Sequence, residues 1–182
     1  MKVIPTGIDG LVVIEPKVFG DERGFFLETY NEKPFRDVGL PTHFVQDNWS
    51  RSQKGVLRGI HFQNPNPQGK LVRVVTGAVW DVAVDLRRSS PTFGKWYGLE
   101  LSFDNKRAFY VPPGFGHGFV TLSDTADFQY KCTGLYAPQD EVGLMWNDPD
   151  LGIRWPIDQP QLSAKDLKLP SLRDVIQNGK TY

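Results

Sequence analysis

Short hydrophobic runs, rich in β-branched and aromatic residues and separated by glycine and proline turns, recur along the chain. This pattern predicts many short strands and few helices. The predicted strands cover residues 11–15, 24–30, 44–52, 55–62, 70–76, 77–86, 96–101, 107–111, 117–121, 126–133 and 143–146. A short helix is predicted over residues 32–38, with Gly39 as its stop, and a second one beginning at Ser163. Strands at this spacing favour an all-β sandwich or barrel over a βαβ repeat.

A period of two divides several of these runs into two faces. In residues 80–87, one face holds Trp80, Val82, Val84 and Leu86 and the other holds Asp81, Ala83, Asp85 and Arg87. The first face is expected to pack a core and the second to carry charge. In residues 46–52, one face holds the polar residues Gln46, Asn48, Ser50 and Ser52. In residues 57–63, one face holds Leu57, Gly59, His61 and Gln63. Such polar faces are either a solvated outer surface or the lining of a cavity that holds one ligand inside a barrel.

Composition and charge fit one folded domain over residues 1–182. Positive and negative side chains balance at 21 each, so no net field favours nucleic acid or an anionic membrane. The single cysteine, Cys132, excludes an internal disulfide and fits a reducing compartment. Pro5 and Gly7 interrupt the first residues, unlike a signal peptide, and no run approaches the roughly 20 apolar residues of a membrane helix. We therefore expect a cytoplasmic location.

The histidines are the first candidates for chemistry, because the chain has only three of them, His43, His61 and His117. They are isolated in sequence and no His-x-His pair occurs, which disfavours a metal site. No nucleophile elbow, Walker loop or dinucleotide fingerprint is present either. Acid–base chemistry at His61 is left, since imidazole suits the removal of a proton from a carbon next to a carbonyl group.

Two residues could assist His61, and each also has a structural explanation. Tyr130 shares a strand face with Phe128 and Cys132, so it is either a packed core residue or a proton donor. His117 lies between glycines after a Pro-Pro-Gly turn, where small neighbours allow either a tight turn or the close approach of a ligand.

Each charged candidate likewise has both a functional and a structural explanation. Asp166 stands three residues after Ser163, which is the spacing of a capping box. Arg23, Arg58 and Lys70 are suited to clamping a phosphate group, yet each alone is also an ordinary surface charge.

Seven blocks, taken together, resemble the dTDP-4-dehydrorhamnose 3,5-epimerase family. They are DERGFFLETYN, QDNWSRSQKGVLRGIHFQ, QGKLVRVVTGAVWDVAVDLRRSSPTFGKW, VPPGFGHGFVTLSD, YKCT, WNDPDLGIRWP and LSAKD, in one order from about Gly20 to Asp166. The resemblance implies a cupin-type double-stranded β-helix, a jelly-roll barrel with a few short peripheral helices. It also implies a homodimer that needs no metal or organic cofactor.

The resemblance further implies an isomerase acting on dTDP-4-dehydro-6-deoxy-D-glucose, which it epimerises at C3 and C5 on the route to dTDP-L-rhamnose. His61 matches the family's base and Tyr130 its acid. Asp166 matches the carboxylate that orients the base, with Asp81 as a second possible partner. Lys70 is expected to stabilise the enolate, because positive charge in a site poor in water is worth several kcal/mol. The residues with expected catalytic roles are His61, Tyr130, Asp166 and Lys70.

Binding residues follow from the same resemblance. Those expected at the pyrophosphate or sugar are Arg23, Arg58 and Lys165, while Lys70, with His117 close by, is expected to bind the substrate at the enolate oxygen. Those expected to hydrogen-bond thymidine or sugar are Glu28, Gln46, Asp47, Asn48 and Glu141, with Tyr136 stacked on thymine and Phe26 as an aromatic wall. The arm that carries Arg23 and Glu28 is expected to complete the partner's site in the dimer. Gly134 and Leu135 depart from the family pattern beside Tyr136.

Three alternatives stay open at the level of sequence. Relatives in specialised deoxysugar pathways keep the histidine and the tyrosine yet invert one carbon of the same dTDP-4-keto sugar. A noncatalytic sugar-nucleotide-binding barrel would bind the ligand without exchanging its C3 or C5 hydrogens. A metal-dependent cupin oxygenase would contain stoichiometric iron.

Overall fold

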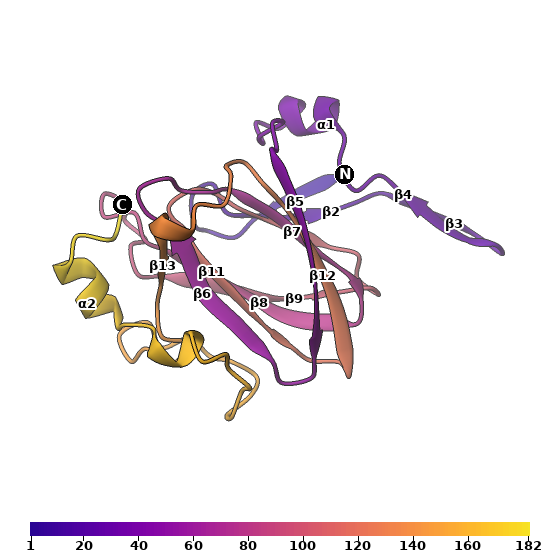
Figure 1. The fold of residues 1–182 in the computed structure, drawn as a ribbon. Coiled ribbons are helices and arrows are strands. Elements are labelled where there is room, and N and C mark those ends of the chain that lie inside the picture. Colours follow the sequence, from indigo (N-terminus) through magenta and orange to yellow (C-terminus); the bar gives the residue numbers. More distant parts are fainter.

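The computed structural model describes the whole chain, Met1–Tyr182, and is built almost entirely of strands (Figure 1). The strands are β1 (Lys2–Pro5), β2 (Val12–Glu15), β3 (Val18–Asp21), β4 (Gly24–Leu27), β5 (Gln46–Gln53), β6 (Leu57–Gln63), β7 (Lys70–Thr76), β8 (Ala78–Asp85), β9 (Trp96–Ser102), β10 (Ala108–Val111), β11 (Phe115–Thr121), β12 (Thr125–Cys132) and β13 (Glu141–Gly143). The helices are α1 (Glu32–Asp37) and α2 (Leu172–Gln177), with two 3-10 segments, η1 (Pro138–Asp140) and η2 (Asp166–Lys168). Neither helix has the length and hydropathy needed to cross a bilayer.

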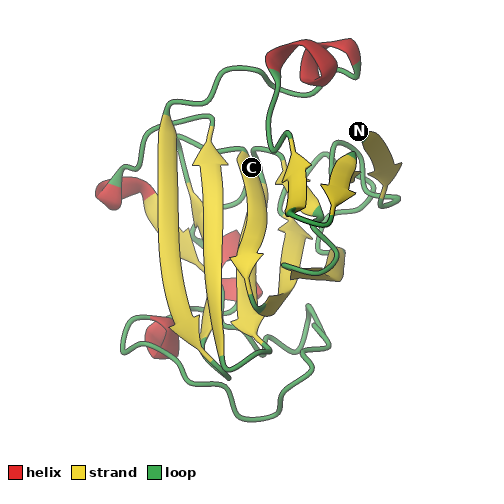
Figure 2. Cartoon of the chain, turned by 90° about the vertical axis from the view of Figure 1, so that its right-hand side faces the viewer, coloured by secondary structure: helices red, strands yellow, loops and turns green.

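Two antiparallel sheets form the body of the molecule (Figure 2). One has six strands in the order β1-β2-β10-β7-β12-β5, and the other has five in the order β13-β6-β11-β8-β9. Side chains from both sheets meet in one hydrophobic cluster, which includes Phe109 and Phe128 from the first sheet and Leu101 and Phe119 from the second. The alternation of apolar residues along each strand supplies this core, and each fully buried Leu or Phe stabilises it by about 1.5–3 kcal/mol. The all-β jelly-roll prediction is confirmed.

The outer faces of both sheets are also partly covered. Ile60, Val82 and Val84 of the five-stranded sheet pack against the C-terminal segment through Leu144 and Leu172. On the other side, the six-stranded sheet is covered by α1 through a smaller cluster around Phe35, Leu71 and Tyr110. The five-stranded sheet therefore lies between two apolar layers.

Burial corrects the expectation that one face of β8 is solvated and charged. Asp81 and Asp85 are both fully buried, so both faces of this strand lie inside the protein. On β5, by contrast, the exposed residues are Asp47, Trp49, Arg51 and Gln53, while the alternate polar set, Gln46, Asn48, Ser50 and Ser52, points inward. The polar faces belong to the interior of the barrel and not to its outer surface.

The hairpin of β3 and β4 projects from the body of the molecule (Figure 1). Four large apolar residues of this arm are exposed, Val18, Phe19, Phe25 and Phe26. Because the arm does not pack into a core, β3 lacks the alternation of apolar and polar residues that would have predicted a strand.

Most predicted elements are found within a few residues of their expected bounds. The strand expected at 143–146 is instead β13, because Glu141 and Val142 pair with the end of β6. The helix expected from Ser163 is only the short η2, and β1, β3 and α2 were not predicted. Helix α2 is capped by Ser171, whose side chain forms a capping box with that of Asp174.

Candidate active site

A polar cavity of about 560 Å³ opens between the two sheets. A smaller cavity of about 290 Å³ adjoins it and shares His61, Lys70 and Tyr130 with it. The larger cavity receives Arg58, His61 and His117 from the five-stranded sheet and Ser50, Lys70 and Tyr130 from the six-stranded sheet. The smaller cavity is lined in addition by Gln46, Asn48, Gln63, Cys132, Tyr136 and Glu141. The polar faces of β5 and β6 therefore line an internal cavity.

His61 is paired with Asp166, which is brought to β6 by the segment around η2. The distance from His61 Nε2 to Asp166 Oδ1 is 2.6 Å, and the Ser163 hydroxyl donates to the other carboxylate oxygen at 2.9 Å. Burial alone would raise the pKa of Asp166, but the hydrogen bond and charge of His61, with smaller contributions from Ser163 and Lys165, lower it below its ordinary value. An ionised Asp166 accepts a hydrogen bond from the Nε2–H group of His61. In a neutral ring this leaves Nδ1 free to take up a proton.

A second histidine–aspartate pair lies at the wall of the same cavity, to which His117 contributes. His117 Nε2 is 2.9 Å and 3.0 Å from the two carboxylate oxygens of Asp81, and both side chains are buried. Asp81 is therefore the hydrogen-bond partner of His117, and Asp166 is the carboxylate that contacts His61.

Lys70 and Tyr130 lie across the cavity from His61. Burial lowers the pKa of Lys70, although Cys132, Asp81 and Glu141 oppose part of this effect. Burial raises the pKa of Tyr130, so its hydroxyl carries a proton at neutral pH.

Arg58 reaches the same cavity because β6 contains a bulge. His61 pairs with His117 and Arg58 with Phe119, so three steps on β6 face two on β11. Gly59 lies at this point with φ +119°, and a Cβ there would come within 2.5 Å of Gly118 Cα. The extra residue turns both Arg58 and His61 inward, and Arg58 Nε donates to Ser52 Oγ at 3.0 Å.

The outer part of the smaller cavity is built around Glu141. Its carboxylate accepts a hydrogen bond from the Tyr136 hydroxyl at 2.6 Å and pairs with Lys165 at 2.5 Å. Gln46 and Asn48, both expected here, are joined by a hydrogen bond of 2.9 Å. Lys165, which also lines the larger cavity, is thus paired with a carboxylate in this chain.

Several expected binding residues do not reach this cavity within the chain. Asp47 faces outward and pairs with Lys131. Arg23 is highly exposed and pairs with Asp21, and Phe26 is exposed on the same arm.

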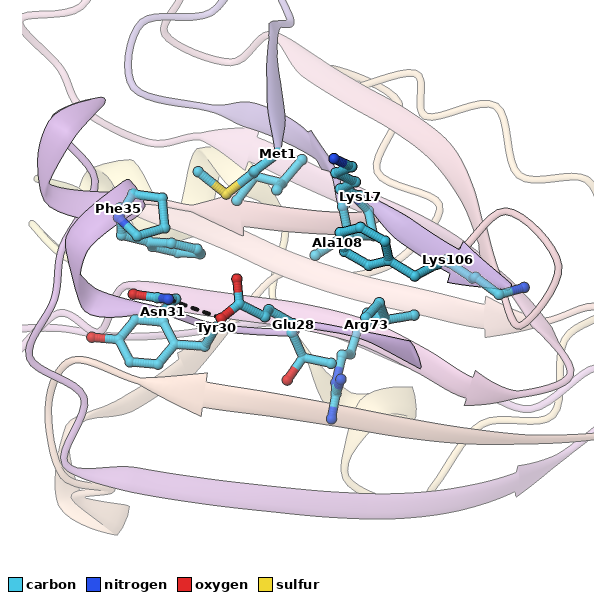
Figure 3. A pocket seen from close by; sticks show the side chains of 15 residues that line it. Met1, Lys17, Glu28, Tyr30, Asn31, Phe35, Arg73, Lys106 and Ala108 are labelled. Carbon is cyan, nitrogen blue, oxygen red and sulfur yellow. Dashed lines mark hydrogen bonds between the residues drawn. The ribbon is translucent and has the colours of Figure 1, made fainter. Parts of the chain in front are cut away.

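Glu28 lines a different cavity at the base of the arm, where Figure 3 shows its carboxylate turned toward Asn31. Asn31 Nδ2 donates to it at 2.9 Å. The arm residues therefore have no contact with the cavity that holds His61 in their own chain.

Sequence reasoning gave no role to Ser50, Gln63 or Ser163. Ser50 and Gln63 share strand faces with Asn48 and His61, so the period of two was the signal that could have placed them in the site. For Ser163, the capping spacing was noticed. Its hydroxyl accepts from the backbone N–H of Asp166 and donates to the carboxylate of Asp166, although the N-cap of η2 is Lys165. No group of three or more His, Cys, Asp or Glu side chains is arranged to hold a metal ion.

Comparison with known proteins places this geometry in a family. A family model described as dTDP-4-dehydrorhamnose 3,5-epimerase matches residues 5–174. The dTDP-4-dehydrorhamnose 3,5-epimerase of Salmonella typhimurium is 56% identical over 175 residues, covering 94% of this chain and 96% of that protein. The dTDP-4-dehydrorhamnose 3-epimerase of Streptomyces niveus is 44% identical over 179 residues, covering 96% and 86%. A solved 3,5-epimerase from Legionella pneumophila, in complex with dTDP-4-keto-L-rhamnose, is 52% identical with a TM-score of 0.94, covering 99% of this chain and 96% of that one.

Proposed function

Since the chain belongs to the dTDP-4-dehydrorhamnose 3,5-epimerase family and is an epimerase, we propose that it inverts both C3 and C5 of dTDP-4-dehydro-6-deoxy-D-glucose. The product is dTDP-4-dehydro-L-rhamnose, an intermediate of dTDP-L-rhamnose biosynthesis. The observation that carries the proposal is the placement of His61 and Tyr130 in opposite sheets, on facing walls of one cavity. Inversion needs a base on one face of the sugar and an acid on the other.

The ketone at C4 makes the hydrogens on both neighbouring carbons acidic, so one base can act on each in turn. Nδ1 of His61 removes the proton from the carbon, and the electron pair of the broken C–H bond moves into an enolate with its negative charge on the C4 oxygen. The Tyr130 hydroxyl then protonates the same carbon from the opposite face. The tyrosinate regains a proton from solvent and the imidazolium releases one, which restores both residues for the second carbon.

Lys70 is suited to stabilise the enolate. Its ammonium group has no ion-pair or hydrogen-bond partner in the protein and lines the cavity. The carboxylates of Asp81 and Glu141 oppose the loss of its charge. Asp166 positions His61 and stabilises the imidazolium that forms. None of these steps calls on a cofactor.

The rest of the substrate is proposed to extend from this point. Arg58 and His117 lie where they can bind the diphosphate or sugar, and Tyr136 can stack on thymine in the smaller cavity. We also propose that residues 1–182 form one functional domain, since the C-terminal segment both covers a sheet and supplies Asp166.

A homodimer is proposed to complete the site. Arg23, Phe26 and Glu28 are expected in the site yet lie on the projecting arm, away from the cavity of their own chain. A second copy related by two-fold symmetry would receive this arm beside its own cavity.

Complementation tests this arrangement. His61→Ala removes the base but leaves the arm, whereas Arg23→Ala weakens the arm but leaves the base. If the arm acts on the partner, an equal mixture that exchanges subunits regains about a quarter of the wild-type activity, because half of the dimers are mixed and each has one intact site. An inactive mixture, with subunit exchange demonstrated, would contradict the proposal.

Proton NMR in deuterated buffer tests the reaction itself. Deuterium at C3 and C5, with inversion at both, is the expected result for the double epimerase. The likeness to a 3-epimerase makes inversion of one carbon the second candidate. Tight binding of the substrate with no exchange at either carbon would favour a noncatalytic binding protein.

A further inference from the structure

Gln63 is a buried side chain that the proposed mechanism does not use. It ends β6, two residues after His61, and is only 4% exposed. Its amide oxygen accepts from the backbone N–H of Ala137 at 2.9 Å, and its amide nitrogen donates to the carbonyl groups of Asn66 at 2.8 Å and Leu135 at 3.3 Å. The amide therefore binds the backbone of two loops, residues 64–69 and 133–140, and both of its N–H donors are used.

Two of these three bonds flank Tyr136. Leu135 and Ala137 are its immediate neighbours, so Gln63 fixes the backbone on both sides of the tyrosine. The Tyr136 side chain itself is about half exposed, with 51% of the residue accessible, and packing does little to hold it. Its position depends instead on hydrogen bonds, including one from its backbone N–H to Gln46 Oε1 at 2.9 Å.

The backbone of Gln63 is held from the other side by the C-terminal segment. The Tyr182 hydroxyl donates to the Gln63 carbonyl oxygen, and the Tyr182 ring packs against Phe62 with 5.9 Å between ring centroids. The side chain of Asn64 donates to the Lys180 and Thr181 carbonyl oxygens, each at 3.0 Å. Because these contacts hold this end of β6 in place, the Gln63 amide can in turn hold the loop that carries Tyr136.

We infer that Gln63 is a positioning residue that holds Tyr136 against the nucleotide, and so sets the affinity for the dTDP part of the substrate without taking part in proton transfer. The inference rests on the proposed function, in which Tyr136 stacks on thymine. A change at Gln63 should alter the affinity for the nucleotide but not the rate of proton transfer, because His61 is held by Asp166 and not by Gln63.

Gln63→Glu is the most direct test. The substitution keeps the size and one acceptor oxygen, but it removes both donated bonds and sets a carboxylate against two carbonyl oxygens. We expect the Kd for dTDP, measured by calorimetry on the full chain, to rise about tenfold. Turnover at saturating substrate should stay within about threefold of the wild type, so that KM changes and kcat does not.

A double-mutant cycle with Tyr136→Ala shows whether Gln63 acts through the tyrosine. In the Tyr136→Ala background, Gln63→Glu should change the Kd by less than about twofold. Gln129→Glu is the matched control, because it makes the same change on β12, where Gln129 accepts from Arg73 and does not contact the Tyr136 loop.

An unchanged Kd in folded Gln63→Glu protein, or a tenfold effect that persists when Tyr136 is alanine, would overturn the inference. Should Gln63→Glu fail to fold, Gln63→Met removes the same hydrogen bonds without adding charge and is judged by the same two criteria. A wild-type protein that does not bind dTDP would refute the proposed function itself, which distinguishes the two failures.

Discussion

Replacing Asp166 by asparagine tests how much the negative charge beside His61 contributes to proton abstraction. The carboxylate is 2.6 Å from Nε2, and its side chain is only 5% exposed. The amide oxygen of asparagine can still accept the Nε2 hydrogen, so the ring keeps a similar orientation. What disappears is the charge that stabilises the imidazolium formed when Nδ1 takes up a proton.

The size of the effect follows from the geometry. A hydrogen bond to a charged group is worth about 1.5–3 kcal/mol, against about 0.5–1.5 kcal/mol for a neutral one, so the typical loss is about 1 kcal/mol. The Coulomb energy of two unit charges 4 Å apart at an effective dielectric constant of 20 is about 4 kcal/mol, which sets the upper limit. Because the His61 side chain is 28% exposed, solvent screens part of this energy. We expect the rate to fall by about 10-fold to 100-fold, at 1.36 kcal/mol for each factor of ten.

The assay is the initial rate of deuterium incorporation at C3 and C5, followed by proton NMR at saturating substrate. Asp148→Asn is the control, because Asp148 is equally buried but accepts hydrogen bonds from backbone N–H groups of residues 150, 151 and 172. It should lower the melting temperature and leave exchange by the folded enzyme unchanged. Exchange by Asp166→Asn within twofold of the wild type, or an equal loss in Asp148→Asn, would refute the reasoning.

Three further predictions concern the enolate, the bulge and acid stability. Lys70→Met should lower kcat about 100-fold in steady-state assays, because it removes positive charge from the enolate; a rise in KM alone would contradict that role. Gly59→Ala should lower the free energy of unfolding in urea by about 4 kcal/mol, from left-handed backbone strain and the clash with Gly118. Gly7→Ala, at φ +87° with no atom nearby, should lose about 1 kcal/mol, and equal losses would count against the clash. Burial alone would raise the pKa of Asp85, but hydrogen bonds from three side chains lower it to about 2. A carboxylate whose pKa is lowered by folding stabilises the folded state at pH values above its unfolded pKa, and this stabilisation is lost as the pH falls to the folded pKa. The free energy of unfolding of Asp85→Asn in urea should therefore be about 2 kcal/mol below that of the wild type at pH 7, and the difference should vanish between about pH 4 and pH 2. A deficit that does not vary with pH would show that the charge of Asp85 is not its source.

Much of the fold was predictable because packing and sequence pattern agree. Strands β7, β8 and β12 alternate against a common core, and their bounds were found to within one or two residues. Strand β3 could not be predicted in this way, since all four of its residues are exposed and no core imposes an alternation on them. Helix α2 was missed although Ser171 and Asp174 stand at capping-box spacing, because a helix of six residues gives too short an apolar pattern.

The candidate site was less accessible to sequence reasoning, because its contacts join distant parts of the chain. His61 and Asp166 are 105 residues apart, and no spacing rule links them. The family resemblance favoured Asp166 as the partner of His61 and kept Asp81 as a second possibility. Both are buried acids near a histidine, and only the three-dimensional structure separates their partners. The arm posed the opposite problem, since its residues were recognised but lie away from the cavity of their own chain.

Arg58 shows most clearly why a period of two can mislead. Strict alternation puts Arg58 and His61 on opposite faces of β6, because they are three residues apart. The bulge adds one residue between them and reverses the parity, so both side chains enter the cavity. A glycine within a strand pattern is the sequence signal of such a bulge, and Gly59 lies directly between the two. Alternation therefore assigns faces only up to the next bulge. In this strand, the break in alternation brings the guanidinium group of Arg58 and the imidazole of His61 to the same wall of the cavity.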